Sequence, residues 1–205
     1  MKMGIVERGC LEKTRNEARR QQVLKGATDC FCRHGFHSAS MAEIARSAGM
    51  SVGHIYHYFE NKEAIIAAIV QNNQAEILAT MDMIERCQRP LSEALIEAVG
   101  TGVDKCMAHQ DTALMIEVLA EAARNPKVAA VLQASDSVLR ARMGEMLRKA
   151  AKPGTDLSDG RLEGHVETLF TLFQGISVRA IRNPGLNRDR MVRTMQGVIR
   201  WLLDN

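Results

Sequence analysis

The chain has 205 residues, of which 46% are hydrophobic, 25% charged and only 4% aromatic, and its net charge is +3. This composition is typical of a globular protein with a well-filled core, and with only 4 prolines it favours helices over a turn-rich sheet protein. No apolar run approaches the roughly 18 to 20 residues that span a bilayer, and MKMGIVERGCLEKTR has no continuous apolar segment for a signal peptide. We therefore expect an all-α, cytoplasmic protein.

The excess positive charge lies at the N-terminal end. Residues 1–63 carry 10 Lys and Arg and 7 Asp and Glu, whereas residues 64–205 carry 17 of each. This imbalance favours a partner that carries phosphates.

The five cysteines are an odd number without a repeated spacing, so a disulfide framework is not expected. Cys30 and Cys32 are two residues apart, which on a helix points them in different directions and disfavours a shared metal or redox site. Cys87 and Cys106 are either small apolar core residues or thiol sensors, and the sequence leaves both roles open.

Four helices are expected in the first part of the chain, opened by capping residues and closed by glycines that can adopt a left-handed conformation. The first, about 15–34, follows a disordered or extended start to about residue 13. The second and third have about two turns each, and the fourth runs toward Cys87. The capping signals are Thr14 with Glu17, Ser40 with Glu43, Ser51 and Asn61, and the stop signals are Gly35 and Gly49.

Five more helices are expected in the rest of the chain. Proline and polar residues mark the breaks between them, and Asn125-Pro126 is a cap followed by proline at the first helical position. The clearest loop is 152–160. The expected helices run from Ser92 to about His109, from Asp111 or Thr112 to Arg124, from Pro126 to about Ala151, and over about 160–182 and 188–203. This makes about nine helices without a strand pattern.

Two short helices joined by Ala48-Gly49-Met50-Ser51 match a helix-turn-helix, because the glycine-containing turn lets the second helix stand across the first. In that motif, residues at the start of the second helix meet base edges in the DNA major groove. The apolar side chains of Ile55 and Phe59, four residues apart, anchor the helix to the core. The remaining surface of the helix carries Ser51, Val52, Gly53, His54, Tyr56, His57 and Tyr58. Tyrosine hydroxyls, imidazoles and Lys62 suit a sugar-phosphate backbone.

Residues 31–65, FCRHGFHSASMAEIARSAGMSVGHIYHYFENKEAI, resemble the DNA-binding domain of the TetR family of bacterial transcriptional regulators. Around this stretch, the whole match extends over about 50 residues of the N-terminal part and agrees in composition, order and spacing. It implies a helix-turn-helix DNA-binding domain at 1–63 and an effector-binding and dimerisation domain at 64–205. It also implies a repressor that leaves a palindromic operator when a small-molecule effector binds. The implied partners are double-stranded DNA, the effector and a second copy of the chain. The resemblance implies neither a membrane partner nor a cofactor.

The resemblance also implies roles for individual residues. Tyr56, His57, Tyr58 and Lys62 fall where the family contacts phosphate, although Tyr56 and Tyr58 are alternatively covers of the helix junction. Ser40 falls near the DNA backbone, at the start of the second helix. Ser51, Val52 and Gly53 fall at base edges, and Val52 offers an apolar contact such as one with a thymine methyl group. His54 replaces a small hydroxyl residue, and it either donates to a phosphate or reads a base.

A basic run precedes this domain, and it is either a solvated helix face or a set of contacts to the DNA backbone or minor groove. Its members are Lys13, Arg15, Arg19 and Arg20.

The resemblance further implies a dimer formed by the helices at about 160–182 and 188–203. Each helix carries a wide apolar stripe, which the pattern alone assigns equally to the core or to a partner chain. Candidate effector-binding residues are soft apolar side chains with one amide: Met107, Met115, Phe170, Phe173 and Gln174. His109 and His165 are not spaced as a metal pair, so no metal site is predicted.

Three alternatives stay open. The first is a thiol-responsive regulator in which Cys87 or Cys106 replaces the effector. The second is a helical enzyme with His109 or His165 as a base, which is disfavoured because the sequence lacks a G-x-S-x-G motif and a phosphate-binding glycine loop. The third is a helical adaptor whose helix-turn-helix does not bind DNA.

Overall fold

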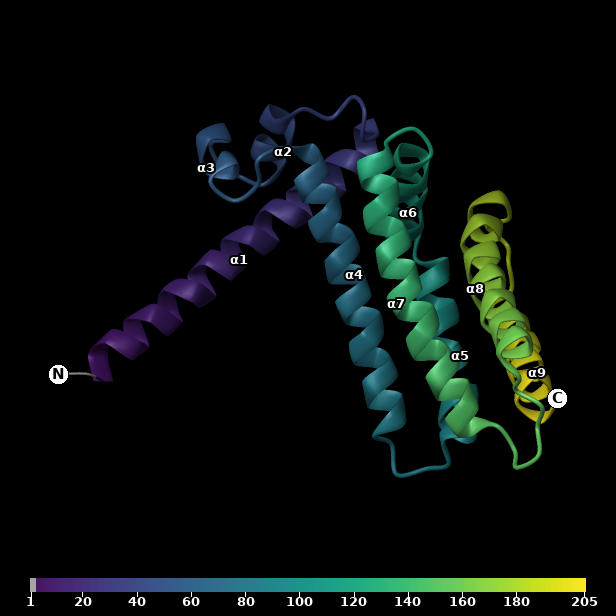
Figure 1. Ribbon diagram of the computed structural model, residues 1–205. Helices are drawn as coiled ribbons and strands as arrows, with labels where there is room; N and C mark the ends of the chain where they lie inside the picture. The colour runs from purple at the N-terminus through teal and green to yellow at the C-terminus, as the bar shows by residue number, and fades with distance from the viewer. Residues whose placement is uncertain (1–2) are drawn as a thin grey trace. The chain divides into compact units, whose positions relative to one another are not determined.

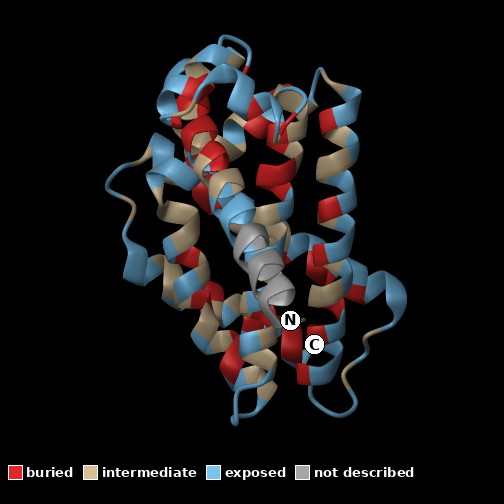
Figure 2. Cartoon of the chain, turned by 90° about the vertical axis from the view of Figure 1, so that its left-hand side faces the viewer, coloured by how far each residue is buried: buried red, intermediate tan, exposed pale blue. Residues whose placement is uncertain are grey.

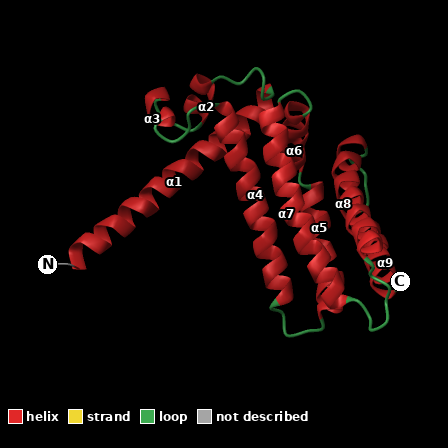
Figure 3. Cartoon of the chain, viewed as in Figure 1, coloured by secondary structure: helices red, strands yellow, loops and turns green. Residues whose placement is uncertain are grey.

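A computed structural model describes the backbone of residues 3–205 and the side chains of residues 14–205. Within this range the chain forms nine helices and no strand, which confirms the all-α prediction (Figure 3). The helices, labelled in Figure 1, are α1 (Met3–His34), α2 (Met41–Ser47), α3 (Val52–Tyr56), α4 (Lys62–Glu85), α5 (Leu91–Met107), α6 (His109–Ala122), α7 (Pro126–Ala150), α8 (Asp159–Arg182) and α9 (Arg188–Asp204). None of the helices in the described part of the chain is both long enough and apolar enough to cross a membrane.

The helices group into two compact units. The first comprises Met1–Gln71 and Ile116–Val131, and the second comprises Asn72–Met115 and Leu132–Asn205. Helices α4, α6 and α7 therefore each have residues in both units. The functional division into residues 1–63 and 64–205 stays a prediction.

The start of α1 differs from the sequence-based expectation. The helix begins at Met3 rather than near residue 15, so the predicted disordered or extended start is wrong. Thr14 and Glu17 consequently lie inside the helix and do not cap it. The physical reason is that residues 3–13 contain no proline and several good helix formers, so nothing in them stops the helix. The side chain of Lys13, the first member of the basic run, lies outside the described residues.

The local signals around α2 and α3 are confirmed. The Ser40 hydroxyl accepts a hydrogen bond from the Glu43 N–H while the Glu43 side chain accepts one from the Ser40 N–H, which completes a capping box. Gly35 and Gly49 have φ angles of 76° and 63°, in the left-handed region that glycine adopts without strain. Ser51 caps α3, and its hydroxyl accepts a hydrogen bond from the N–H of His54 at 3.3 Å.

The core of the first unit holds α1, α2 and α3 together. Ile55 is completely buried and Phe59 is 3% exposed, as the sequence predicts for the anchors of α3. The backbone of α1 passes very close to the turn between α2 and α3, because a Cβ built on Gly26 would lie 2.6 Å from the backbone nitrogen of Ala48. Only glycine fits at that crossing without displacing the turn. Figure 2 shows that buried residues occupy parts of the helix surfaces while other parts of the same helices are exposed.

In the second unit, α5 packs against both α8 and α9. The structure assigns the apolar stripes of α8 and α9 to this unit's own core, which decides a question that the sequence left open. The buried members of the stripes are Leu162, Val166, Leu169, Ile176, Met195, Ile199 and Leu202, and the partly buried members are Phe170, Phe173, Met191, Val192 and Val198.

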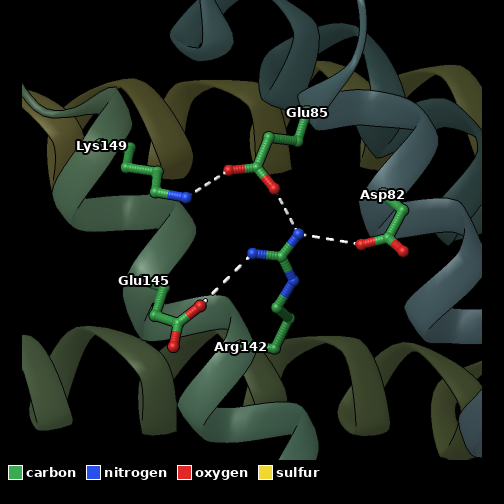
Figure 4. A network of polar contacts seen from close by, with 5 residues as sticks. All are labelled: Asp82, Glu85, Arg142, Glu145 and Lys149. Carbon is green, nitrogen blue, oxygen red and sulfur yellow. Dashed lines mark hydrogen bonds and ion pairs between the residues drawn. The ribbon is translucent and has the colours of Figure 1, made fainter.

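A network of ion pairs joins the second half of α4 to α7 within the second unit (Figure 4). The guanidinium of Arg142 binds Asp82 at 2.9 Å and Glu145 at 3.3 Å, and it also pairs with Glu85. Lys149 pairs with Glu85 as well. Hydrogen bonds from Lys149 and Arg142 lower the pKa of Glu85, so this carboxylate stays ionised at neutral pH.

Candidate DNA-binding interface

The cap and the first turn of α3 are exposed to solvent. Ser51, Val52, Gly53 and His54 are all exposed, and the Val52 side chain is 37% exposed. Ile55 is buried and anchors the helix to the core, whereas these four residues stay in contact with solvent. This is the arrangement that base-edge contacts require of a recognition helix.

Gly53 has no structural role that the described residues explain. Its φ angle is not in the left-handed region, and a Cβ built on it would meet no described atom of the chain within 4 Å. Glycine inside a helix costs about 1 kcal/mol relative to alanine. The missing side chain therefore leaves open space on the exposed surface at the start of α3.

The imidazoles and phenols of α3 and the residues after it form a small aromatic cluster. The Tyr58 hydroxyl lies 3.4 Å from Nε2 of His54, and the two rings are 5.3 Å apart. His57 packs edge-on against the Tyr58 ring at 5.2 Å. Tyr58 is half-buried, whereas Tyr56 is 53% exposed and is free to contact a partner. Of the two tyrosines, Tyr58 thus has the greater part in covering the helix junction.

Lys62, the first residue of α4, makes contacts within the chain that the sequence did not predict. Its Nζ donates hydrogen bonds to the backbone carbonyls of Phe36 at 2.8 Å and His37 at 3.1 Å. It also lies 4.8 Å from the centre of the Phe36 ring, a favourable position for a cation. The ammonium group has three donors, so one is left for a phosphate.

Ser40 is likewise engaged inside the chain. Its hydroxyl accepts from the Glu43 N–H at 3.2 Å and donates to the Glu43 carboxylate at 2.9 Å. Hydrogen bonds from the Ser40 N–H and hydroxyl lower the pKa of Glu43. Ser40 therefore has no unused hydroxyl hydrogen, and a contact to a phosphate would compete with the capping box.

A hollow of about 280 Å³ separates α1 from α3 and the residues that follow it. It brings part of the basic run next to the predicted DNA-contacting residues. Its lining side chains are Arg15, Asn16, Arg19, His54, His57 and Tyr58. Arg20 has a different role, because its guanidinium lies 4.7 Å from the centre of the Phe59 ring.

Asn16, Gln22 and Gly26, which also shape this interface, were not predicted. Gln22 donates a hydrogen bond to the carbonyl of Ala48 at 2.7 Å, and so ties α1 to the turn between α2 and α3. The only sequence signal for these residues was their position on the polar side of α1 or, for Gly26, a glycine inside a helix.

The predicted effector-binding residues lie in different environments. Met107, Phe170 and Phe173 are partly buried against the core of the second unit, Met115 is half-buried and Gln174 is exposed. They line neither the hollow described above nor a second one between residues 183 and 194. The Phe173 ring lies directly on α5, because a Cβ built on Gly102 would be 2.9 Å from it.

The thiols differ in accessibility. Burial raises the pKa of Cys106, although a hydrogen bond with Ser177 partly opposes this, so little of the reactive thiolate is present at neutral pH. Cys87 is exposed. His165 is 7% exposed, and its Nδ1 has no hydrogen-bond partner among the described residues. Burial, with help from nearby Arg161, lowers the pKa of His165 and keeps the imidazole neutral.

Two family models match this chain. Residues 23–69 match the bacterial regulatory proteins of the tetR family, and residues 85–204 match the C-terminal part of BetI-type transcriptional repressors. The second match alone spans more than half of the chain. The chain belongs to the TetR family. It is therefore a transcriptional regulator of the helix-turn-helix type.

Individual relatives agree with this assignment to the TetR family. The chain is 31% identical over 147 residues to the HTH-type transcriptional regulator UidR of Escherichia coli K12. The aligned region covers 69% of this chain and 71% of UidR. It is similar to the structure of GusR from Salmonella enterica, with a TM-score of 0.73 and 28% identity over 91% of this chain and 95% of GusR.

The fold is also shared with FadR from Bacillus subtilis, whose structure holds stearoyl-CoA. The TM-score is 0.64 and the identity 18%, over 89% of this chain and 97% of FadR. TetR-family regulators bind DNA operators, act as dimers and bind small-molecule ligands.

Proposed function

We propose that this TetR-family regulator is a repressor. Two copies bind a palindromic operator through α2 and α3, and they leave it when a small-molecule effector binds. The observation that carries the proposal is the exposed first turn of α3, where Val52 is partly solvated and Gly53 has open space. A folded chain gains nothing internally from either feature, but a recognition helix pressed against base pairs uses both. Such a regulator acts in the cytoplasm, with the bacterial chromosome, and has no catalytic role.

The residues of the interface divide by the group that they contact. Ser51, Val52 and Gly53 meet base edges, where the Val52 methyl groups suit a thymine methyl and Gly53 permits close approach of the backbone. Tyr56 and His57, both exposed, donate to phosphates. Phosphate contacts hold the helix in register while the base edges supply specificity.

Three further residues contribute to the interface through positioning as well as contact. Lys62 holds the turn at Phe36 and offers its third donor to a phosphate. Ser40 caps the start of α2 through its bonds with Glu43, and so positions this helix end near the DNA backbone. Tyr58 supports His54 from the side.

The proposed dimer uses the outer faces of α8 and α9, because their apolar stripes are already buried inside the chain. Exposed residues on these faces recur at alternating spacings of four and three, which is the pattern of a seam between packed helices. Most are small, so a partner helix can approach closely. They are Gly164, Thr168, Thr171, Gly175 and Val178 on α8, and Thr194, Gly197 and Trp201 on α9.

Two details support this seam. A Cβ built on Gly164, Gly175 or Gly197 would meet no atom of the described chain within 4 Å, so the space beside these glycines is open. The Trp201 side chain is 57% exposed, which is costly for a large apolar group unless a partner covers it.

A charge inserted into the seam tests the dimer. Thr171→Glu places a carboxylate in the middle of the α8 face. We expect sedimentation velocity to show that this variant is a monomer, and a binding titration to show weakened affinity for the operator. Ser137→Glu adds the same charge at an exposed position of α7 and should leave the dimer intact. A dimeric Thr171→Glu protein would contradict this interface.

The effector is proposed to bind the second unit. Met107, Phe170 and Phe173 are partly buried at the edge of its core, and flexible or flat apolar side chains of this kind adapt to an apolar ligand. Met115 and Gln174 complete the candidate set. To act, the effector must bind the DNA-incompetent arrangement more tightly than the DNA-bound one.

A footprint on the DNA upstream of the protein's own gene tests the repressor proposal. We expect one protected site with inverted-repeat symmetry, and reduced transcription from the adjacent promoter when the protein is present. If no site is protected at physiological salt, the protein does not repress its own gene. Protection with increased transcription would make the protein an activator.

A further inference from the structure

The hollow between α1 and α3 has the chemistry of an anion-binding site. Two of its six lining side chains are guanidinium groups, two are imidazoles, and the other two are an amide and a phenol. None of the six is a carboxylate, so every lining side chain offers a hydrogen-bond donor or can do so. Arginine is the residue best suited to a phosphate, because its planar fork donates two parallel hydrogen bonds.

Arg19 is held in place by a chain of hydrogen bonds that leads to the helix-turn-helix. Its Nη1 donates to Oε1 of Gln22 at 2.9 Å, and Nε2 of Gln22 donates to the carbonyl of Ala48 at 2.7 Å. Ala48 lies at the turn between α2 and α3. The guanidinium is therefore positioned relative to the recognition helix, and its remaining donors are available to a ligand.

The opposite wall of the hollow is also ordered before any ligand binds. The rings of His54 and Tyr58 are 5.3 Å apart and tilted by 45°, with their polar atoms 3.4 Å apart, and His57 packs edge-on against Tyr58. Preorganised donors lose less conformational entropy on binding than free surface side chains do.

We infer that this hollow binds one phosphate of the operator backbone, next to the bases that α3 reads, with Arg15 and Arg19 as the donors from α1. The inference rests on the proposed DNA-binding function and extends the interface to the first helix. His54 lines the same hollow, so it contacts this phosphate from the α3 side. Gln22 is a positioning residue, because it acts through Arg19. The same side chains could also bind a free phosphate ion. The experiment distinguishes binding of a phosphate of the operator from binding of a free phosphate ion.

The test uses the full-length protein and the footprinted operator. Arg15→Gln, Arg19→Gln and the double variant are compared with Arg33→Gln by fluorescence anisotropy over a series of salt concentrations. Arg33 is a matched control, since it is exposed on the same helix, carries the same charge and does not line the hollow. Each phosphate contact contributes about 0.9 to the slope of log affinity against log salt.

We expect the double variant to lose affinity by about 10-fold or more and the slope to fall by about one, with the control close to wild type. The Arg15→Gln protein keeps the test decisive if Arg19→Gln destabilises the fold, because Arg15 is exposed. Wild-type affinity and slope in the double variant would overturn the inference while leaving DNA binding intact. Equal losses in the double variant and the control would also overturn it, because they indicate a general charge effect.

A second arm measures inorganic phosphate binding to the DNA-free protein by calorimetry. Saturable binding that the double variant lacks, together with unchanged operator affinity, would assign the hollow to a free anion instead. If the wild-type protein shows no salt-sensitive DNA binding at all, the proposed function fails, and the inference fails with it.

Discussion

The carboxylate of Glu117 in α6 accepts a hydrogen bond at 2.9 Å from the backbone N–H of Phe36. The carbonyl of Phe36 accepts another from Nζ of Lys62 in α4 at 2.8 Å. The turn between α1 and α2 is thus held from two helices at once. Both α4 and α6 also have residues in the second unit.

Removing the Glu117 carboxylate should loosen that turn. Glu117→Ala leaves the Phe36 N–H without its partner, and we expect the free energy of unfolding in urea to fall by about 1 to 3 kcal/mol. Glu117→Gln keeps an acceptor oxygen at the same distance from the helix and should lose much less. Equal stability of both variants and the wild type would show that the hydrogen bond does not hold the turn.

Lys62→Met separates the two roles of Lys62. Because two carbonyls lose a charged donor, we expect a stability loss of about 1.5 to 3 kcal/mol in the same urea experiment. If the third donor binds a phosphate, the salt slope of operator binding also falls by about one. A protein that is destabilised but keeps the wild-type slope would make Lys62 a structural residue only.

Gly53→Ala should uncouple stability from function. Alanine fits without a clash and improves helix propensity, so the thermal midpoint should rise by an amount equivalent to about 1 kcal/mol at most. The added methyl group occupies space that we assign to the DNA, so operator affinity should fall by about 10-fold or more, or about 1.4 kcal/mol. Unchanged affinity in an anisotropy titration would contradict close approach at this position.

His165 should make stability depend on pH near neutrality. Its pKa is lowered in the folded protein from its ordinary value of 6.5, so the unfolded chain binds the proton more readily. Stability is therefore lost as pH falls through 6.5. We expect the thermal midpoint of the wild type to drop more than that of His165→Leu between about pH 7.5 and 5.5. Parallel pH profiles for the two proteins would show that His165 does not titrate in this way.

The carboxylate network of α4 and α7 should act in a separate and more acidic window. The pKa of Glu85 is lowered below its ordinary value of 4.5, so its contribution is present above that pH and is lost as pH falls through the folded value. Glu85→Gln should therefore flatten the stability profile below pH 4.5 and leave the profile near neutrality unchanged. A change confined to neutral pH would contradict this assignment.

The parts of the fold that the sequence predicted correctly depend on local rules. The caps at Ser40 and Ser51 and the left-handed turn at Gly49 involve residues within four positions of each other, and their residue types specify the geometry. The start of α1 was missed because a capping pattern is not exclusive: Thr14 and Glu17 also fit inside a longer helix when no stop signal precedes them.

The contacts that shape the DNA-binding unit could not be read from the sequence, because they join residues far apart in the chain. The Gln22–Ala48 hydrogen bond spans 26 positions, and that between Phe36 and Glu117 spans 81. Neither leaves a periodic pattern. The apolar stripes of α8 and α9 were visible, but periodicity does not say whether a stripe meets its own core or a second chain.

The most direct test of the DNA-binding account is selection of bound duplexes from a random-sequence library by the wild-type protein. We predict an enriched inverted repeat, and loss of that enrichment in Gly53→Ala despite its intact fold. The two helix-turn-helix units of a dimer contact half-sites whose centres lie about one helical turn of DNA, or a multiple of it, apart. We expect this spacing between the two halves of the enriched repeat. Enrichment of no sequence, or of one without two-fold symmetry, would contradict a dimeric regulator that reads DNA through α3.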